Sequence, residues 1–239
     1  MAAVEEVPVW LEVNRVPAVT WMCTPELLEE LAVGWLHGEG YIERVEQVRL
    51  KPCAGSLGFW AEIPEELAAA VAAEGRRPVL ASGCGAVATY LADVDSAPHE
   101  DPRAAPPDAA VLRELLKALF HRGLRYRETG GVHAAALTDG RDLVSHAEDI
   151  GRHNAVDKVI GAALLEGRER DENPALAGLG LLVTGRISAE LAFKAARARL
   201  AWVATPSVPS TLARDIARRS GMTLVGRAAS GTPDYHRPK

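Results

Sequence analysis

The sequence predicts a layered α/β protein, built on a mixed sheet that is at least partly parallel. Three observations support this prediction. Short apolar runs alternate with helical patterns through the second half of the chain. Cap residues and glycines separate these segments. The first 63 residues instead carry paired strand patterns, which indicates a smaller strand-rich subdomain at the N-terminus.

Residues 7–21 alternate apolar and polar residues and predict two strands joined at Asn14-Arg15. Thr24-Pro25-Glu26 predicts the start of a helix, with Thr24 as N-cap and Pro25 in the first turn, and the helix should end near Gly38 or Gly40. A second strand pair over 45–63 and an Ala-rich helix over 64–75 should follow.

The second half of the chain predicts the main sheet and its helices. Helices are expected over 108–122, 149–166, 187–200 and 210–220, and strands over 131–137, 142–147, 179–183, 202–205 and 222–226. The chain of 239 residues is long enough for one large domain or two small ones. We divide it into an N-terminal subdomain (1–95), a mobile Pro-rich linker (96–108) and an α/β core (109–239) with cofactor-binding loops.

Composition excludes several classes of protein. The net charge is −5, which argues against nucleic acid or an anionic membrane as partner. No apolar run approaches the roughly 18 residues of a membrane span. The first ten residues carry acids where a signal peptide carries Lys or Arg. We therefore expect a cytoplasmic protein without membrane or nucleic-acid partners.

Three cysteines are too few, and too far apart in the sequence, for a disulfide framework or a usual structural zinc site. Cys84 is flanked by Gly83 and Gly85, which leave its sulfur uncrowded. The sequence around Cys84 leaves two interpretations of this residue open: a reactive, exposed thiol, or a small buried side chain at a strand end. Cys23 and Cys53 fit the second interpretation.

Two segments could carry a ligand site in the middle of the chain. In Thr-Gly-Gly-Val-His (129–133), the two glycines would let a ligand or another backbone segment come close to His133. The alternative, and the more common role of such a histidine, is a hydrogen-bonded residue of the core. Residues 148–158 form the densest polar cluster, where a strand gives way to a helix. Its candidate ligand-binding residues are Asp149, Arg152, His153, Asn154, Asp157 and Lys158. We prefer a functional interpretation to a plain solvated helix start.

Two more segments follow strands and contain small residues, hydroxyls and an arginine. Thr184–Ser188 opens a helix and offers Gly185, Arg186 and Ser188 to a phosphate, although it is not a Walker A loop. Residues 226–232 suit a nucleotide or phosphate, with a flexible C-terminal tail as a serious alternative. Each signal is weak when taken alone.

Taken together, these segments resemble the formate dehydrogenase accessory sulfurtransferase family, FdhD. The resemblance rests on five segments that run in order along the chain: TPELLEELAVGWLHGEGYI (24–42), TGGVHAAAL (129–137), EDIGRHNAVDKVIG (148–161), TGRISAELAFKAA (184–196) and TLVGRAASG (223–231). The resemblance implies a core similar to the cytidine deaminase fold. It also implies a homodimer that takes persulfide sulfur from a cysteine desulfurase. The sulfur passes to molybdenum bis(molybdopterin guanine dinucleotide), a bound substrate, for the client formate dehydrogenase.

The resemblance also assigns residues. Cys84 matches the sulfur carrier of the family's Cys-x-x-Cys motif, whereas Val87 stands in place of the second cysteine. The family's guanine-nucleotide contact matches Arg227, Ala228, Ala229, Ser230, Gly231 and Thr232, where the closing arginine is absent and Arg227 stands in for it. No structural metal is implied.

Two other functions compete with sulfur transfer. His146-Ala147-Glu148 matches half of the zinc deaminase signature, but no cysteine follows Cys84 to complete the metal site, so we reject zinc. A cofactor-binding chaperone without sulfur transfer is the second alternative, and the missing second cysteine keeps it open.

Overall fold

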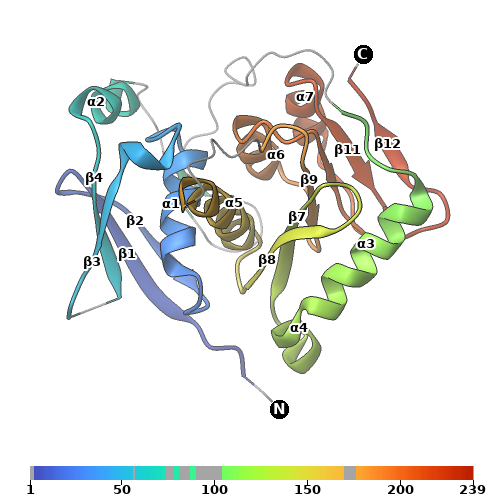
Figure 1. Cartoon of the computed structure of the whole chain (residues 1–239), viewed down its shortest axis with the longest axis horizontal. Helices are drawn as coiled ribbons and strands as arrows, with labels where there is room; N and C mark the ends of the chain where they lie inside the picture. Colours follow the sequence, from blue (N-terminus) through green and yellow to red (C-terminus); the bar gives the residue numbers. More distant parts are fainter. Residues whose placement is uncertain are drawn as a thin grey trace.

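The computed structural model describes residues 3–55, 57–73, 78–80, 87–89, 104–169 and 176–238. Two sheets lie on either side of a layer of helices (Figure 1). The strand order is β2-β1-β4-β3 in the four-stranded sheet and β12-β11-β10-β9-β7-β8 in the six-stranded sheet, while β5 (Pro78–Leu80) pairs with β6 (Val87–Thr89). The α/β class with a mixed sheet is confirmed.

The N-terminal hairpin forms where the sequence predicts it. β1 (Val7–Val13) and β2 (Val16–Cys23) are antiparallel, and the connecting Asn14 and Arg15 have φ angles of 48° and 69°. Two successive positive φ angles match the right-handed twist of a hairpin. The second predicted strand pair is also confirmed: β3 (Arg49–Pro52) is antiparallel to β4 (Gly58–Glu62), which runs parallel to β1. A 3₁₀ helix, η1 (Val45–Gln47), precedes this pair, and α2 (Glu65–Ala73) follows it.

The start of the first helix differs from the sequence prediction. α1 spans Leu28–Gly38, and its N-cap is Leu27, in the left-handed region with φ 52° and without a capping side chain. The prediction of Thr24 as N-cap is wrong. Thr24 is fully buried, and its hydroxyl donates to the Asp149 carboxylate and accepts from the Lys158 ammonium, while α1 begins only four residues later.

The six-stranded sheet has a parallel centre and antiparallel additions. β9 (Gly180–Val183), β10 (Trp202–Ala204) and β11 (Thr223–Gly226) are parallel neighbours. β7 (His133–Thr138) is antiparallel to β9 and to the edge strand β8 (Leu143–Asp149), and β12 (Asp234–His236) is antiparallel to β11. The sequence pattern does not predict β12 or the short helix α4 (Leu124–Thr129). The prediction of Asp149 in a helix is wrong, since Asp149 ends β8 opposite His133.

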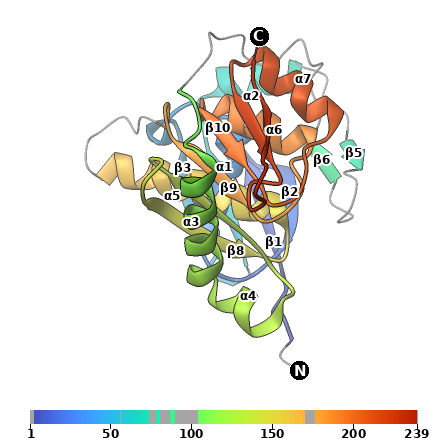
Figure 2. The same ribbon diagram turned by 90° about the vertical axis from the view of Figure 1, so that its right-hand side faces the viewer.

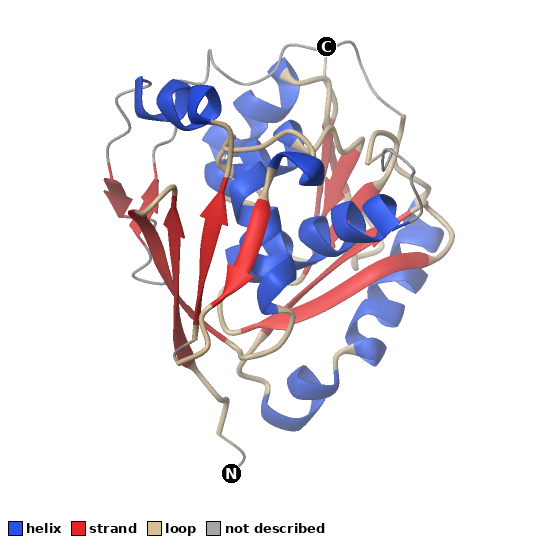
Figure 3. Ribbon diagram, turned by 60° about the vertical axis from the view of Figure 1, so that its left-hand side comes forward, coloured by secondary structure: helices blue, strands red, loops and turns tan. Residues whose placement is uncertain are grey.

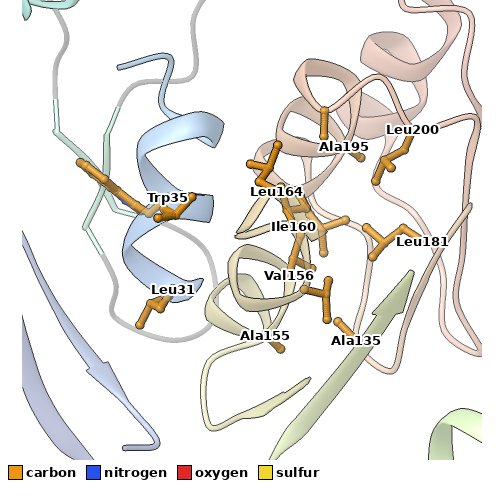
Figure 4. Packing of buried hydrophobic residues seen from close by; sticks show 14 of the residues in the cluster. Leu31, Trp35, Ala135, Ala155, Val156, Ile160, Leu164, Leu181, Ala195 and Leu200 are labelled. Carbon is orange, nitrogen blue, oxygen red and sulfur yellow. The ribbon is translucent and has the colours of Figure 1, made fainter. Parts of the chain in front are cut away.

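α5 (Arg152–Glu169) belongs to the layer of helices between the two sheets (Figure 3) and packs closely against α1. The crossing depends on two glycines. A Cβ on Gly34 would overlap the backbone of Asp157, and a Cβ on Gly161 would overlap the carbonyl of Glu30. Apolar side chains from α1, α5, β7 and β9 pack around this crossing in one continuous core (Figure 4).

Three further helices complete the layers. α6 (Ala189–Arg197) and α7 (Thr211–Arg219) cover the same face of the six-stranded sheet as α5. α3 (Ala109–Arg122), capped by Asp108, covers the opposite face (Figure 2). The helix expected over 210–220 begins with Ser210 as its N-cap, and Ser188, which the sequence suggested as a phosphate contact, is the N-cap of α6, since each accepts a hydrogen bond from the first turn of its helix. Within the described ranges, no helix is long and apolar enough to cross a membrane.

The division of the chain into domains stays a prediction, because residues 90–103 lie outside those that the structure describes.

Candidate functional site

The sequence segments that suggested a ligand site meet at one edge of the six-stranded sheet. The carboxyl ends of β8, β9, β10 and β11 lie at this edge, and so does the start of β7. His133 is therefore opposite Asp149, and Thr184 bonds to the backbone of Ala134 on the next strand. In α/β folds this is the edge where ligands bind. We call it the carboxyl edge.

Part of the 148–158 cluster is a closed, buried polar network. The Lys158 ammonium lies 2.6 Å from Asp149 and donates to the carbonyl and hydroxyl of Thr24 at 3.0 and 2.9 Å. Asp149 also accepts from the amides of Thr24 and Gly151 and from the Asn154 side chain. Asp149 and Lys158 are fully buried. These contacts connect the end of β2 to β8 and α5. The carboxyl edge is therefore fixed in position by the side chains of Asp149, Asn154 and Lys158.

A second buried network joins α1, α5 and α6. Lys194 donates to both carboxylate oxygens of Asp157 at 2.8 Å and lies 3.7 Å from Glu39. Burial opposes the charge on Lys194, but the carboxylates of Asp157, Glu39 and Glu190 outweigh burial and raise its pKa. Asp157, a predicted ligand residue, is 1% exposed and directed at Lys194. Its contacts indicate a positioning role.

His153 connects this second network to the carboxyl edge. Its Nε2 lies 2.9 Å from the Ser188 hydroxyl and 3.4 Å from Glu190. The same hydroxyl accepts from the Leu191 amide and so caps α6. Burial, reinforced by the positive charge of Arg152, lowers the pKa of His153 to about 3. The imidazole is therefore neutral near pH 7, and it fixes the start of α6 by hydrogen bonding.

His133, Arg152 and Gly185 lie together at the front of the carboxyl edge. A Cβ on Gly185 would come within 3.3 Å of the His133 ring and of the Arg152 side chain. This is closer than ordinary van der Waals contact, so glycine lets the end of β9 approach these two side chains without displacing them. His133 is half-buried, and burial together with the nearby Arg152 lowers its pKa. A neutral imidazole beside a guanidinium can donate to or accept from a polar ligand.

The other side of the carboxyl edge carries exposed arginines. Arg186 and Arg227 are exposed, and Arg227 adopts a positive φ of 48° as the chain leaves β11. Ala229, Gly231 and Thr232 are exposed as well, and Ser230 is half-buried. Ala228 is fully buried against the α3 side of the sheet, so it shapes this loop from below.

The backbone of the loop after β11 is largely committed to internal bonds. The amides of Arg227 and Ala228 donate to Ser207 and Thr205, and the amides of Ser230 and Thr232 donate within the loop. An amide cradle for phosphate, which the glycines and hydroxyls of the sequence suggested, is therefore not the main feature of this loop. A ligand at this loop would therefore contact mainly its side chains.

The His146-Ala147-Glu148 segment has a structural role. The Glu148 carboxylate accepts from the amides of Arg125 and Tyr126 and so caps α4. On the other side of the strand, Ala147 and Asp149 face α5, because strand residues alternate between faces.

The cysteines fall in different environments. Cys84 lies outside the described residues. Cys23 is fully buried, and burial raises the pKa of its thiol to about 12, which makes it unreactive. Cys53 is half-buried just after β3.

Sequence reasoning missed four residues of these networks: Thr24, Glu39, Glu190 and Lys194. One signal was available for Lys194. It falls among Ala192, Ala195 and Ala196 on an amphipathic helix, and a lysine on the apolar face of a helix requires a buried carboxylate. The identity of that carboxylate depends on the tertiary fold.

The buried histidines predict a pH dependence of stability. Burial, followed by the charges of Arg197 and Lys194, lowers the pKa of His37 to about 4, and that of His153 is about 3. Both titrate near 6.5 in the unfolded chain, which therefore binds more protons below pH 6.5. Each histidine should remove about 2 kcal/mol from the free energy of unfolding between pH 7 and pH 5. Urea unfolding of the wild type and His37→Gln at both pH values checks this, and an unchanged pH dependence in the variant would contradict it.

Comparison with known proteins gives concordant matches. The model of the FdhD/NarQ family matches residues 4–237. "Sulfur carrier protein FdhD" of Xanthomonas campestris pv. campestris (strain B100) is 37% identical over 228 residues, covering 93% of this chain and 79% of that protein. The protein of the same description from Anaeromyxobacter dehalogenans (strain 2CP-C) is 38% identical over 238 residues, covering 94% and 82%. Among solved structures, a candidate formate dehydrogenase accessory protein from Desulfotalea psychrophila has a similar fold, with a TM-score of 0.73 at 24% identity, covering 98% of this chain and 87% of that one.

Proposed function

The chain belongs to the FdhD/NarQ family, and from this premise we propose that it is a sulfur carrier that serves formate dehydrogenase. The relatives described as sulfur carriers align with more than nine-tenths of the chain. The observation that carries the proposal is the convergence of four family-like segments, 129–137, 148–161, 184–196 and 223–231, on one edge of the sheet. Such an edge suits a large polar substrate.

We assign the transfer of sulfur to Cys84. Its thiolate attacks the outer sulfur of a persulfide on a cysteine desulfurase, the S–S bond of that persulfide breaks, and the donor cysteine leaves as a thiolate. Cys84 then holds the sulfur as its own persulfide, without any external oxidant. The sulfur acceptor in this proposal is molybdenum bis(molybdopterin guanine dinucleotide), bound as substrate. The protein would act in the cytoplasm as a homodimer with a cytidine-deaminase-like core.

Residues at the carboxyl edge divide into two groups, according to whether their side chains are engaged in hydrogen bonds or ion pairs that hold the edge together. Residues that a substrate can reach include His133, Arg186, Arg227, Ala229, Gly231 and Thr232. Residues that hold the edge from within include His153, Asn154, Asp157, Lys158 and Ser188. Arginine side chains at the front suit the phosphates of a dinucleotide, since their planar donors match phosphate oxygens.

A cofactor-binding chaperone is the alternative function. The carboxyl edge would then bind the molybdenum cofactor, and Cys84 would carry no sulfur. Val87, in place of a second cysteine, favours this alternative only if transfer needs two thiols. A single thiolate is sufficient to form and to donate a persulfide.

Substitution of the carrier residue separates these functions. Cys84→Ala should abolish the maturation of formate dehydrogenase in cells that lack their own copy of this protein, with activity falling to the level without it. Cys53→Ala is the matched control and should support full activity. Full activity with Cys84→Ala would reject sulfur transfer through Cys84 and favour the chaperone. Equal amounts of both variants, measured by immunoblot, are required for the comparison.

A further inference from the structure

A groove of about 500 Å³ lies between α3 and the turn that joins β7 to β8. One of its walls is α3, from Ala110 to Arg122, and the other is the segment Arg141–Leu143. The groove is on the face of the six-stranded sheet that α3 covers, opposite α5, α6 and α7. None of the candidate residues of the carboxyl edge lines it, so it is a separate feature of the surface. We call it the α3 groove.

The amino-acid sequence of α3 gives the groove its shape. Positions 110, 114, 118 and 122 are four residues apart and form one stripe along the helix. Ala110 and Ala118 occupy two of these positions, and their small side chains leave space beside the helix. Leu115 and Leu143 are buried and line the bottom of the groove, which is therefore apolar.

Three arginines line the same groove. Arg113 is half-buried on α3, whereas Arg122 and Arg141 are exposed. Arg113 and Arg122 each donate one long hydrogen bond, of 3.4 Å, to the backbone carbonyls of Ser230 and Leu143. Within the described ranges, no carboxylate lies at ion-pair distance from any of the three guanidiniums.

The carboxylates around the groove do not neutralise these arginines. Glu114 is paired with Lys117, at 2.6 Å. Asp139, in the turn, accepts from the backbone amides of Arg141 and Asp142. Asp142 also lines the groove. In a protein with a net charge of −5, the α3 groove therefore keeps three guanidiniums available to an acidic ligand.

The length of the groove favours a chain over a small anion. Arg113 and Arg122 are nine residues apart, which is roughly 14 Å along the helix axis. One phosphate ion cannot bridge them and would leave the apolar bottom uncovered. About four residues of an extended chain span the same length, with side chains directed alternately to opposite sides. A segment that alternates acidic and apolar residues would match both the arginines and the apolar bottom, since the planar donors of arginine pair with carboxylates.

We propose that the α3 groove is a docking site for an extended, acidic segment of a partner protein. The apolar side chains of the segment lie over Leu115 and Leu143, and its carboxylates pair with the three arginines. Arg113 also contacts the carbonyl of Ser230, in the loop after β11. A segment bound in the groove is thus next to the support of that loop.

Fluorescence anisotropy with the labelled peptide Glu-Leu-Glu-Leu-Glu and the full-length protein tests the role of charge. The wild type should bind this peptide saturably, and at least about tenfold more tightly than Gln-Leu-Gln-Leu-Gln. The double variant Arg122→Gln/Arg141→Gln should weaken binding of the acidic peptide about tenfold or more. Arg127→Gln, which removes an exposed arginine of α4 outside the groove, is the matched control and should bind like the wild type.

A second variant tests the groove without a change of charge. Ala118 is exposed on α3, so Ala118→Phe fills the groove and leaves the core and the arginines as they are. It should weaken peptide binding about tenfold or more. Ala69→Phe, at an exposed position of α2, is its control and should have no effect. Circular dichroism of each variant should match the wild type.

Three results would overturn the proposal. No saturable binding to the wild type would reject a docking site for acidic segments. Unchanged affinity in Ala118→Phe or in Arg122→Gln/Arg141→Gln would place the peptide elsewhere on the surface. Displacement of the peptide by inorganic phosphate of equal affinity would make the groove a site for small anions instead.

Discussion

Alanine at position 161 is expected to prevent the chain from folding. A Cβ on Gly161 would overlap the carbonyl oxygen of Glu30 and lie 2.8 Å from the amide nitrogen of Gly34. Both obstacles are backbone atoms of α1, so no side-chain rotation relieves them. The two helices would have to separate, and the side chains packed around their crossing would lose contact. We expect a loss of about 4 kcal/mol or more in the free energy of unfolding.

Urea unfolding followed by circular dichroism measures this loss, and the soluble yield reports it if the variant does not fold. Gly55→Ala is the matched control, since a Cβ at position 55 would meet nothing within 4 Å. The control should be as stable as the wild type. A Gly161→Ala variant as stable as the control would mean that α1 and α5 are farther apart than the structure has them.

Methionine in place of Lys194 is expected to be the second most damaging change. Lys194 is 2% exposed and neutralises Asp157 and, at longer range, Glu39. Methionine fills the same space but removes the ammonium that donates to both oxygens of the buried Asp157 carboxylate. Removal of one partner of a buried pair costs about 3–5 kcal/mol. Because His153 and the start of α6 lie next to this network, ligand affinity at the carboxyl edge should fall as well.

The effect of Lys194→Met should depend on pH. Burial raises the pKa of Asp157, and Lys194 opposes that rise. Without Lys194, the folded variant holds a proton on Asp157 at pH values where the unfolded chain has released it. Its stability therefore falls as pH rises, and the deficit relative to wild type should be greater at pH 8 than at pH 5. Lys117→Met, which removes an exposed pair with Glu114, should cost at most about 1 kcal/mol at either pH. An equal deficit at both pH values would show that Asp157 stays ionised in the variant.

Local signals in the sequence were sufficient for most of the secondary structure. Asn14-Arg15 predicted the hairpin, and Ser210 predicted the start of α7, because a turn or a cap depends on neighbours a few residues away. Thr24 has the same local signature as Ser210. Its hydroxyl is instead engaged by Asp149 and Lys158, more than 120 residues away, and no local pattern contains that information.

The place of the candidate site was predictable, but the direction of its side chains was not. Polar residues after successive parallel strands gather at the carboxyl edge of a sheet, so Arg152 and Gly185 lie together there, and His133 joins them because the antiparallel strand β7 begins at this edge. Asp157 and Lys158 are fully buried because α5 has the four-stranded sheet and α1 on one side and the six-stranded sheet on the other. A helix enclosed on both sides has little surface for a ligand, and its charged residues must pair within the protein.

Intact mass after incubation with a cysteine desulfurase and cysteine tests the sulfur-carrier function most directly. The purified wild type and Cys53→Ala should each gain the mass of one sulfur atom, and a thiol reductant should remove it. Cys84→Ala should gain none. A gain that persists in Cys84→Ala, or no gain in the wild type, would contradict the assignment of sulfur transfer to Cys84.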